Sequence, residues 1–124
     1  MSKESYIKGA KGEKLALKYL EEAGYKIIKT NYKSKNGEID IIAIDNDILS
    51  FIEVKYYGRK SYFHPLQAIT KNKIKNIINS AKKYYYSSNM RKKCRYDVLA
   101  IENNEDGGNY ILIKDAFREY KNMW

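Results

Sequence analysis

Two short apolar runs separated by a polar turn constrain the fold of this chain more than any other feature. Residues 37–44 and 48–55 are rich in isoleucine, and Asn46 and Asp47 between them are typical turn residues. If these two residues form the hairpin loop, the numbers of paired residues sum to 93. The sequence therefore predicts a tight antiparallel hairpin with this register.

The predicted register brings charged side chains together toward the open end of the hairpin. Asp40 lies opposite Glu53, with Cβ atoms roughly 4.5–5.5 Å apart. Like charges in this arrangement destabilise a sheet unless a cation neutralises them, and carboxylates are preferred ligands of hard divalent cations. Because side chains alternate along a strand, Lys55 shares the face of Glu53 while Val54 points into the core. The spacing predicts a Mg²⁺ or Mn²⁺ site at Asp40 and Glu53.

A metal-bound pair of carboxylates beside an ammonium group is suited to phosphodiester hydrolysis. The cation polarises a phosphoryl oxygen and acidifies a bound water, and Lys55 can orient that water or stabilise developing charge. A simpler interpretation remains open, in which the hairpin is solvated. Glu53 and Lys55 would then form an exposed ion pair worth less than about 1 kcal/mol.

Length and composition favour a single domain over residues 1–124. The apolar fraction of 44% is within the globular range. No apolar run approaches the roughly 20 residues of a membrane-spanning helix, and the N-terminus lacks the apolar stretch of a secretory signal. A single cysteine, Cys94, cannot form an internal disulfide, which fits a reducing compartment. We therefore expect a cytoplasmic protein without a membrane partner.

Positive charge is concentrated in the middle of the chain. The formal net charge is +9, and the segment from Lys55 to Arg95 contains twelve Lys and Arg residues and no Asp or Glu. An AT-rich genome would favour lysine codons, but codon usage does not explain the lack of acids over forty positions. The charge distribution favours a surface that binds the phosphates of a nucleic acid.

The remaining patterns predict an α/β domain with the element order αβββαββα. Besides the hairpin, we expect helices at about 8–23, at 65–86 and around Ala116 and Phe117, and strands at 25–32, 96–101 and 110–113. Turns are expected at 34–37 and 105–108. Because the runs 39–44 and 98–101 are apolar on both faces, the sequence predicts a mixed sheet flanked by helices on both faces.

Two polar side chains lie on helix faces that are otherwise apolar. Glu13 shares a face with Leu17 and Leu20, so it would either reach the edge of the metal site or stay hydrated and complement the helix dipole. Gln67 falls within the apolar arc of the second helix, where its amide could bind a phosphate, a water or a backbone carbonyl. Each of the two residues could therefore either take part in the site or be an ordinary structural residue.

The residues predicted to contact nucleic acid lie on one flank of the second helix and in the segment before it. They are Lys71, Lys75, Lys82, Arg59 and Lys60. At about 100° per residue the three lysines form a stripe on the flank nearest Gln67, whereas Lys73 and Lys83 point elsewhere. Such a stripe would hold a nucleic-acid backbone without reading its sequence.

Five motifs together resemble those of the YraN family of small bacterial proteins. They are Gly12-Glu13, residues 37–43 (GEIDIIA), residues 51–55 (FIEVK), Phe63-His64-Pro65 and Tyr96-Asp97-Val98. The resemblance spans nearly the whole chain. The family in turn looks like a branch of the PD-(D/E)XK nuclease superfamily, which includes restriction endonucleases and Holliday-junction resolvases.

The resemblance implies a restriction-endonuclease-like αβββαβ core and a role for each site residue. The implied metal ligands are Asp40, Glu53 and the carbonyl of Val54. Lys55 would be the catalytic lysine, Glu13 the acid that resolvase-like members carry on the first helix, and Gln67 the polar residue of the following helix. Resolvase-like enzymes act as dimers, so the resemblance leaves a homodimer open.

The chain departs from the pattern of this superfamily at two positions. Ile39 precedes Asp40 where other members have proline, and Tyr57 stands where many relatives have a basic residue, for which Arg59 could compensate. Neither departure removes a metal ligand. The sequence therefore predicts a metal-dependent nuclease acting on branched or single-stranded DNA, or on RNA. A non-catalytic nucleic-acid-binding module and a protein–protein adaptor that uses its tyrosines as an interface remain the alternatives.

Overall fold

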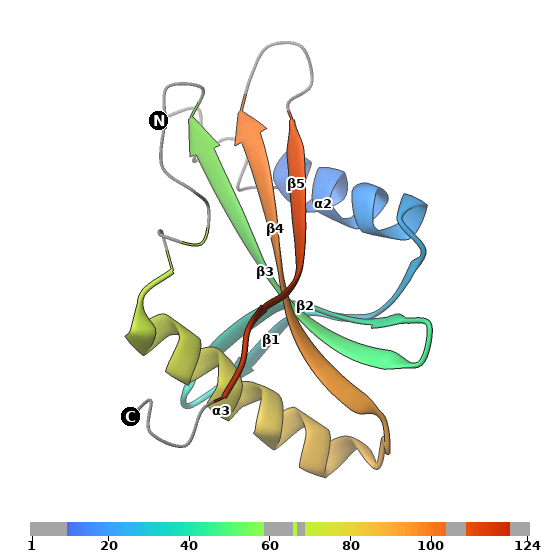
Figure 1. The fold of residues 1–124 in the computed structure, drawn as a ribbon, viewed down its shortest axis with the longest axis vertical. Helices are drawn as coiled ribbons and strands as arrows, with labels where there is room; N and C mark the ends of the chain where they lie inside the picture. Colours follow the sequence, from blue (N-terminus) through green and yellow to red (C-terminus); the bar gives the residue numbers. More distant parts are fainter. Residues whose placement is uncertain (1–9, 59–65, 67–68, 104–108, 120–124) are drawn as a thin grey trace.

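The structure is a computed structural model that describes residues 10–58, 66, 69–103 and 109–119 (Figure 1). Its helices and strands are α2 (Ala10–Glu22), β1 (Tyr25–Ser34), β2 (Gly37–Asp45), β3 (Ile48–Gly58), α3 (Lys71–Ser88), β4 (Lys93–Asn103) and β5 (Tyr110–Phe117). Neither described helix combines the length and the apolar character that crossing a bilayer requires.

All five described strands belong to one sheet, in the order β1-β2-β3-β4-β5. β3 and β4 run parallel, and every other neighbouring pair is antiparallel. A parallel pair needs a long crossover connection, and α3 lies in the segment that joins these two strands. The predicted α/β fold with a mixed sheet is confirmed, and its order is consistent with a restriction-endonuclease-like core.

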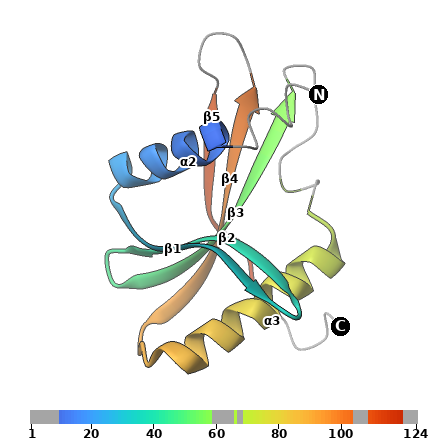
Figure 2. The same cartoon turned by 180° about the vertical axis from the view of Figure 1, so that it is seen from behind.

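The two helices cover opposite faces of the twisted sheet (Figures 1 and 2). The core on the α2 side comprises Ala16, Leu20, Tyr25, Ile41, Ala43, Ile52, Val54, Leu99 and Ile101. The core on the α3 side comprises Ile39, Ile42, Leu49, Phe51, Ile77 and Ala81. Neighbouring residues of β2 such as Ile41 and Ile42 belong to different cores, because side chains alternate along a strand. The expectation of helices on both faces is therefore correct.

The hairpin of β2 and β3 has the predicted turn and register. Asp45 pairs with Ile48, and Ile42 pairs with Phe51, so paired numbers sum to 93. Asn46 has a φ of 56°, in the left-handed region that asparagine tolerates better than most residues. The turn residues between the two strands and the alternation of side chains along each strand were sufficient to predict this pairing.

The second helix begins later than predicted. α3 starts at Lys71, after Thr70 in an extended conformation, whose side chain accepts a hydrogen bond of 3.1 Å from the Lys73 N–H. This N-cap decides the start of the helix. Pro65, the predicted first residue, lies outside the described residues. The helix ends at Ser88 and is followed by the C-cap Asn89, which has a φ of 59°.

The predicted C-terminal helix around Ala116 and Phe117 is wrong. Both residues belong to β5, and Phe117 pairs with Tyr96 of β4 and stacks on its ring at 5.2 Å. The ladder shifts register between Tyr96 and Val98, where β5 passes through Asp115 at a φ of 57°. Pairing with a long neighbouring strand therefore overrides the local helical pattern. The predicted turn at 105–108 lies outside the described residues.

Candidate active site

β2 and β3 separate immediately beyond the Ile41–Ile52 pair, which is the last of their ladder. The predicted pairing of Asp40 with Glu53 is therefore not part of the ladder. Instead, Asp40 Oδ2 accepts a hydrogen bond of 2.8 Å from the Val54 N–H. A side-chain oxygen thus satisfies a backbone donor that the neighbouring strand no longer reaches.

Packing against α3 explains why the start of β2 leaves β3. A Cβ atom on Gly37 would lie 3.3 Å from Asn76 Cβ, so glycine permits a close approach to the helix. The hydroxyls of Ser34 and Ser80 are 2.8 Å apart and join β1 to the same helix. The opening between β2 and β3 that exposes Asp40 is therefore a result of tertiary packing.

The carboxyl groups of Asp40 and Glu53 meet in this opening. Glu53 is only 4% exposed, and Lys73 Nζ and Lys55 Nζ lie 3.5 Å and 3.8 Å from its Oε2. Burial, together with the hydrogen bond and the negative charge of Asp40, raises the pKa of Glu53 to about 8, although Lys73 and Lys55 oppose the increase. The carboxylate pair therefore retains a proton near neutral pH unless more positive charge is supplied.

The donor set fits a hard divalent cation. Among the described residues no group of three or more His, Cys, Asp and Glu is arranged to hold a metal ion, so a cation would rely on Asp40, Glu53 and backbone oxygen. Because the N–H and C=O of a strand residue point to the same side, the Val54 carbonyl is expected to face the side of Asp40. The Val54 side chain packs in the core on the α2 side, as predicted.

The carboxylate pair opens into a pocket of about 530 Å³ between α2, α3 and the sheet. The pocket is lined by both site lysines, by the carboxylate pair and by Glu13 and Glu38. Glu13 is exposed on the first turn of α2, so it remains hydrated and also faces the site. Glu38 was not predicted as a site residue, although it belongs to the motif at residues 37–43, which could have indicated it.

Lys73 is the site residue that sequence reasoning placed wrongly. It was expected to point away from the site, yet it lines the pocket and pairs with Glu53. Its spacing carried a usable signal, because Lys73 lies four and eight residues before Ile77 and Ala81, which face the sheet. The predicted lysine stripe was instead placed on the flank of the helix nearest Gln67, and Gln67 lies outside the described residues.

The other predicted nucleic-acid contacts have different surroundings. Lys71 and Lys75 are exposed on α3 and do not line the pocket. Lys82 forms an ion pair with Glu119. Arg59 and Lys60 lie outside the described residues.

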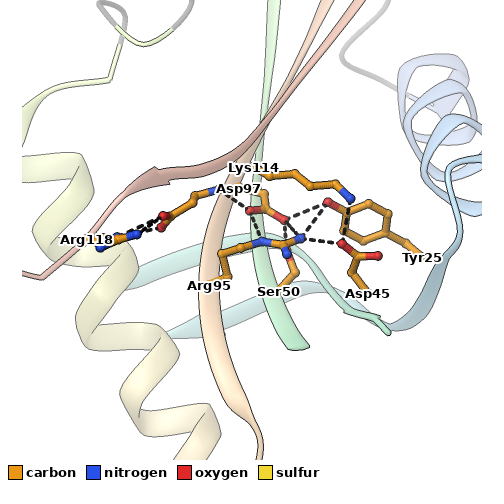
Figure 3. A network of polar contacts seen from close by, with 8 residues as sticks. Tyr25, Asp45, Ser50, Arg95, Asp97, Lys114 and Arg118 are labelled. Carbon is orange, nitrogen blue, oxygen red and sulfur yellow. Dashed lines mark hydrogen bonds and ion pairs between the residues drawn. The ribbon is translucent and has the colours of Figure 1, made fainter. Parts of the chain in front are cut away.

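A second polar network ties all five strands together (Figure 3). Asp97 of β4 is fully buried and accepts hydrogen bonds from side chains of three strands, namely Tyr25 at 2.8 Å, Ser50 at 2.5 Å and Arg95 at 2.8 Å. It also accepts a bond of 2.8 Å from the Asp115 N–H, at the point where the β4–β5 ladder shifts. Burial raises the pKa of Asp97, but these hydrogen bonds outweigh it and hold the pKa below its ordinary value.

This network changes the interpretation of Arg95. The side chain is 14% exposed and pairs with Asp45 as well as Asp97, and Lys114 adds a second cation to Asp45 at 2.9 Å. Arg95 therefore belongs to the interior of the sheet and not to a phosphate-binding surface. The signal for the network was the acid at position 97, directly before the apolar run 98–101.

The raised pKa of Glu53 predicts how pH affects the protein without metal. Because the pKa is about 8 in the folded state and 4.5 ordinarily, the folded state holds a proton that the unfolded state releases between these values. The stability due to this proton is complete below pH 4.5 and is lost as the pH rises through 8. Glu53→Gln should therefore raise the melting temperature in EDTA at pH 8 and change it little at about pH 5.

Differential scanning calorimetry of the wild type, of Glu53→Gln and of Glu21→Gln measures this effect. Glu21 is an exposed acid on α2, and its replacement controls for the loss of one negative charge. The same change at both pH values in Glu53→Gln would contradict the raised pKa.

Known proteins are similar to this chain over most of its length. It is 43% identical over 125 residues to a UPF0102 protein of Chlorobium phaeobacteroides, covering 95% of this chain and 98% of the relative. It is 42% identical over 113 residues to a UPF0102 protein of Clostridium perfringens, covering 89% and 93%. For a UPF0102 protein of Persephonella marina the identity is 40% over 114 residues, covering 91% and 95%.

A sequence model of a protein family matches the segment that contains the site. It is described as "Uncharacterised protein family UPF0102" and matches residues 12–101, which include both carboxylates and both lysines of the pocket. Because the match covers well over half of the chain and several relatives align nearly end to end, the protein is a member of the UPF0102 family.

Proposed function

We propose that this protein is a metal-dependent nuclease of the PD-(D/E)XK superfamily that hydrolyses phosphodiester bonds in branched or single-stranded nucleic acid. The proposal depends on one observation, the approach of Asp40 to the buried Glu53 in a pocket that also receives Lys55. Two carboxyl groups this close are unfavourable in their charged form unless a cation joins them. Strongly shifted acids in a pocket are typical of catalytic sites.

Each residue of the site has a defined role in this proposal. Asp40 and Glu53 bind Mg²⁺ or Mn²⁺ through carboxylate oxygens, assisted by the Val54 carbonyl. When bound, the cation would polarise a phosphoryl oxygen and lower the pKa of a coordinated water. Lys55, 3.8 Å from Glu53, orients the attacking water or stabilises negative charge on the phosphate. Glu13, which lines the pocket, would complete the shell around the cation, and the role of Gln67 remains a prediction from the resemblance.

Charge supports a nucleic acid as the substrate. The chain has a net charge of +9, and Lys71 and Lys75 are exposed on the helix that borders the pocket. Lysines bind phosphates without reading bases, which suits an enzyme that recognises the shape of its substrate. We therefore expect selection by structure more than by sequence.

A non-catalytic nucleic-acid-binding module is the second candidate. It is favoured by the ion pairs of Lys55 and Lys73 with Glu53, which offset the charge of this acid without a metal. In this case the basic surface would remain and the carboxylate pair would be structural.

Cleavage assays with Mn²⁺ test the proposed function. Purified protein should cut a four-way junction, a flap or a single strand in Mn²⁺ or Mg²⁺ and leave all of them intact in EDTA. Binding of the same substrates should weaken steeply as the salt concentration rises. Salt-dependent binding without cleavage under saturating Mn²⁺ would favour the binding module, and the absence of binding would contradict both candidates.

A further inference from the structure

Lys73 contacts the buried carboxylate of Glu53 from the helix α3, not from the strands that carry the other site residues. Its Nζ lies 3.5 Å from Glu53 Oε2, whereas Lys55 Nζ on β3 lies 3.8 Å from the same oxygen. The Lys73 side chain is 40% exposed and lines the pocket, while Glu53 is 4% exposed. The ammonium group of Lys73 therefore pairs with a buried acid, and the exposed part of the side chain can contact a ligand in the pocket.

The backbone that carries Lys73 is held in place. Its N–H donates to the Thr70 side chain at 3.1 Å, which fixes the first turn of α3. One turn later, Asn76 packs against Gly37 at the start of β2. The hydroxyl contact of 2.8 Å between Ser34 and Ser80 joins the same stretch of the helix to β1. The position of Lys73 relative to the opening of the sheet is thus defined by the fold.

The first turn of α3 is an unfavourable place for lysine unless the residue has another role. Helix N-termini favour acidic residues because of the helix dipole, yet this turn has Lys71 and Lys73 and no acid. A local preference that is violated beside a pocket is typical of a functional site.

We propose that Lys73 binds the phosphate of the nucleic acid and is held on Glu53 until a divalent cation takes its place. This inference rests on the nuclease function proposed above. Lys73 Nζ lies 3.5 Å from Oε2 of Glu53, so a cation that used this oxygen would compete with the ammonium group of Lys73. Once displaced, Lys73 remains in the pocket and its ammonium binds a non-bridging phosphate oxygen.

The exchange couples the cation to the nucleic acid. A phosphate that draws Lys73 away from Glu53 removes the competitor of the cation. By thermodynamic linkage, the nucleic acid then raises the affinity for the cation by the same factor by which the cation raises the affinity for the nucleic acid.

Cation binding in the absence of nucleic acid tests the first half of the proposal. Titration calorimetry with Mn²⁺, corrected for the proton that Glu53 releases, should show that Lys73→Ala binds the ion about threefold to tenfold more tightly than the wild type, because the ion pair between Lys73 and Glu53 no longer has to be broken. Lys83→Ala, which removes an exposed lysine from the same helix, should bind Mn²⁺ as the wild type does. Lys73→Arg keeps the positive charge and should not show the gain.

The salt dependence of nucleic-acid binding tests the second half. With Ca²⁺ present, Lys73→Ala should lower the slope of log Kobs against log salt by about 0.7–0.9, the loss of one phosphate contact. In EDTA the same variant should leave the slope unchanged, because Lys73 is then held by Glu53. Fluorescence anisotropy measures both slopes, and Lys73→Arg should restore the wild-type slope in Ca²⁺.

The outcomes separate this inference from the proposed function. If the wild type binds Mn²⁺ and cleaves but Lys73→Ala matches Lys83→Ala in both assays, the role of Lys73 is wrong and the nuclease stands. Equal loss of slope with and without Ca²⁺ would show a phosphate contact without exchange and would overturn the proposal as stated. If the wild type binds no Mn²⁺ at this site, both fail together.

Discussion

Replacement of Asp40 by asparagine is expected to reduce Mn²⁺-dependent cleavage by about 10³-fold or more. The side-chain shape is kept, and an oxygen can still accept the hydrogen bond from the Val54 N–H. What is lost is the negative charge that binds the cation together with Glu53. Asparagine should therefore preserve the fold and remove the catalysis.

Lys55→Ala should have a similar effect on cleavage for a different reason. The cation would still bind, but the ammonium group that lies 3.8 Å from Glu53 would no longer act on the water or the phosphate. Rates are measured on a labelled junction substrate in single-turnover conditions, together with Mn²⁺ titrations. Asp40→Asn should lose Mn²⁺ affinity, whereas Lys55→Ala should bind Mn²⁺ at least as tightly as the wild type, because it also removes an ammonium group from Oε2 of Glu53.

The matched control for the acid is Asp47→Asn, in the exposed turn at the other end of the same hairpin. It removes the same charge and should cleave as the wild type does. Nucleic-acid binding in EDTA should stay nearly unchanged in all three variants. Full cleavage by Asp40→Asn would place the chemistry elsewhere in the protein.

The second large effect is expected on stability, from Asp97→Asn. This change should lower the free energy of unfolding by about 3–5 kcal/mol, because it removes one of the two carboxylates that pair with the partly buried Arg95 and leaves the buried donors around position 97 with a poorer acceptor. Tyr25, Ser50 and the Asp115 N–H all donate hydrogen bonds to the Asp97 carboxylate. The asparagine side chain would present an NH₂ group, which cannot accept these bonds, in place of one carboxylate oxygen. Urea denaturation at neutral pH measures the difference, with Asp47→Asn as the control.

The pH dependence provides a second readout for Asp97. Its pKa is lower in the folded state than its ordinary value of 3.8, so its contribution is present above that value and is lost as the pH falls. The difference in stability between the wild type and Asp97→Asn should therefore shrink in acid. A destabilisation below about 1 kcal/mol at neutral pH would mean that the network is not a major source of stability.

The hairpin and the two helix-covered faces could be predicted from the sequence because their signals are local. Turn residues at 46 and 47 set the register, and alternation assigned Val54 to the core. Apolar runs on both faces of the strands indicated that helices would cover both sides of the sheet. Each of these inferences depends only on residues that lie close together in the sequence.

Other features depended on partners far apart in the chain. The strand at Ala116 and Phe117 forms because it pairs with β4, where Tyr96 lies 21 residues before Phe117. Asp97 in an apolar strand gave no indication of its partner Tyr25, which lies 72 residues earlier. Periodicity does not specify such partners.

The sequence alone determined which side chains form the candidate site: two acids that could bind a cation and a lysine beside them, all on one hairpin. The tertiary structure decided how they meet, because packing of Gly37 on α3 draws β2 away from β3 and leaves Asp40 bound to the Val54 N–H. It also brought Lys73 to Glu53 from a separate helix. The physical reason is that hairpin pairing is set by neighbouring residues, whereas the opening of a sheet and the approach of a helix are set by contacts between distant segments.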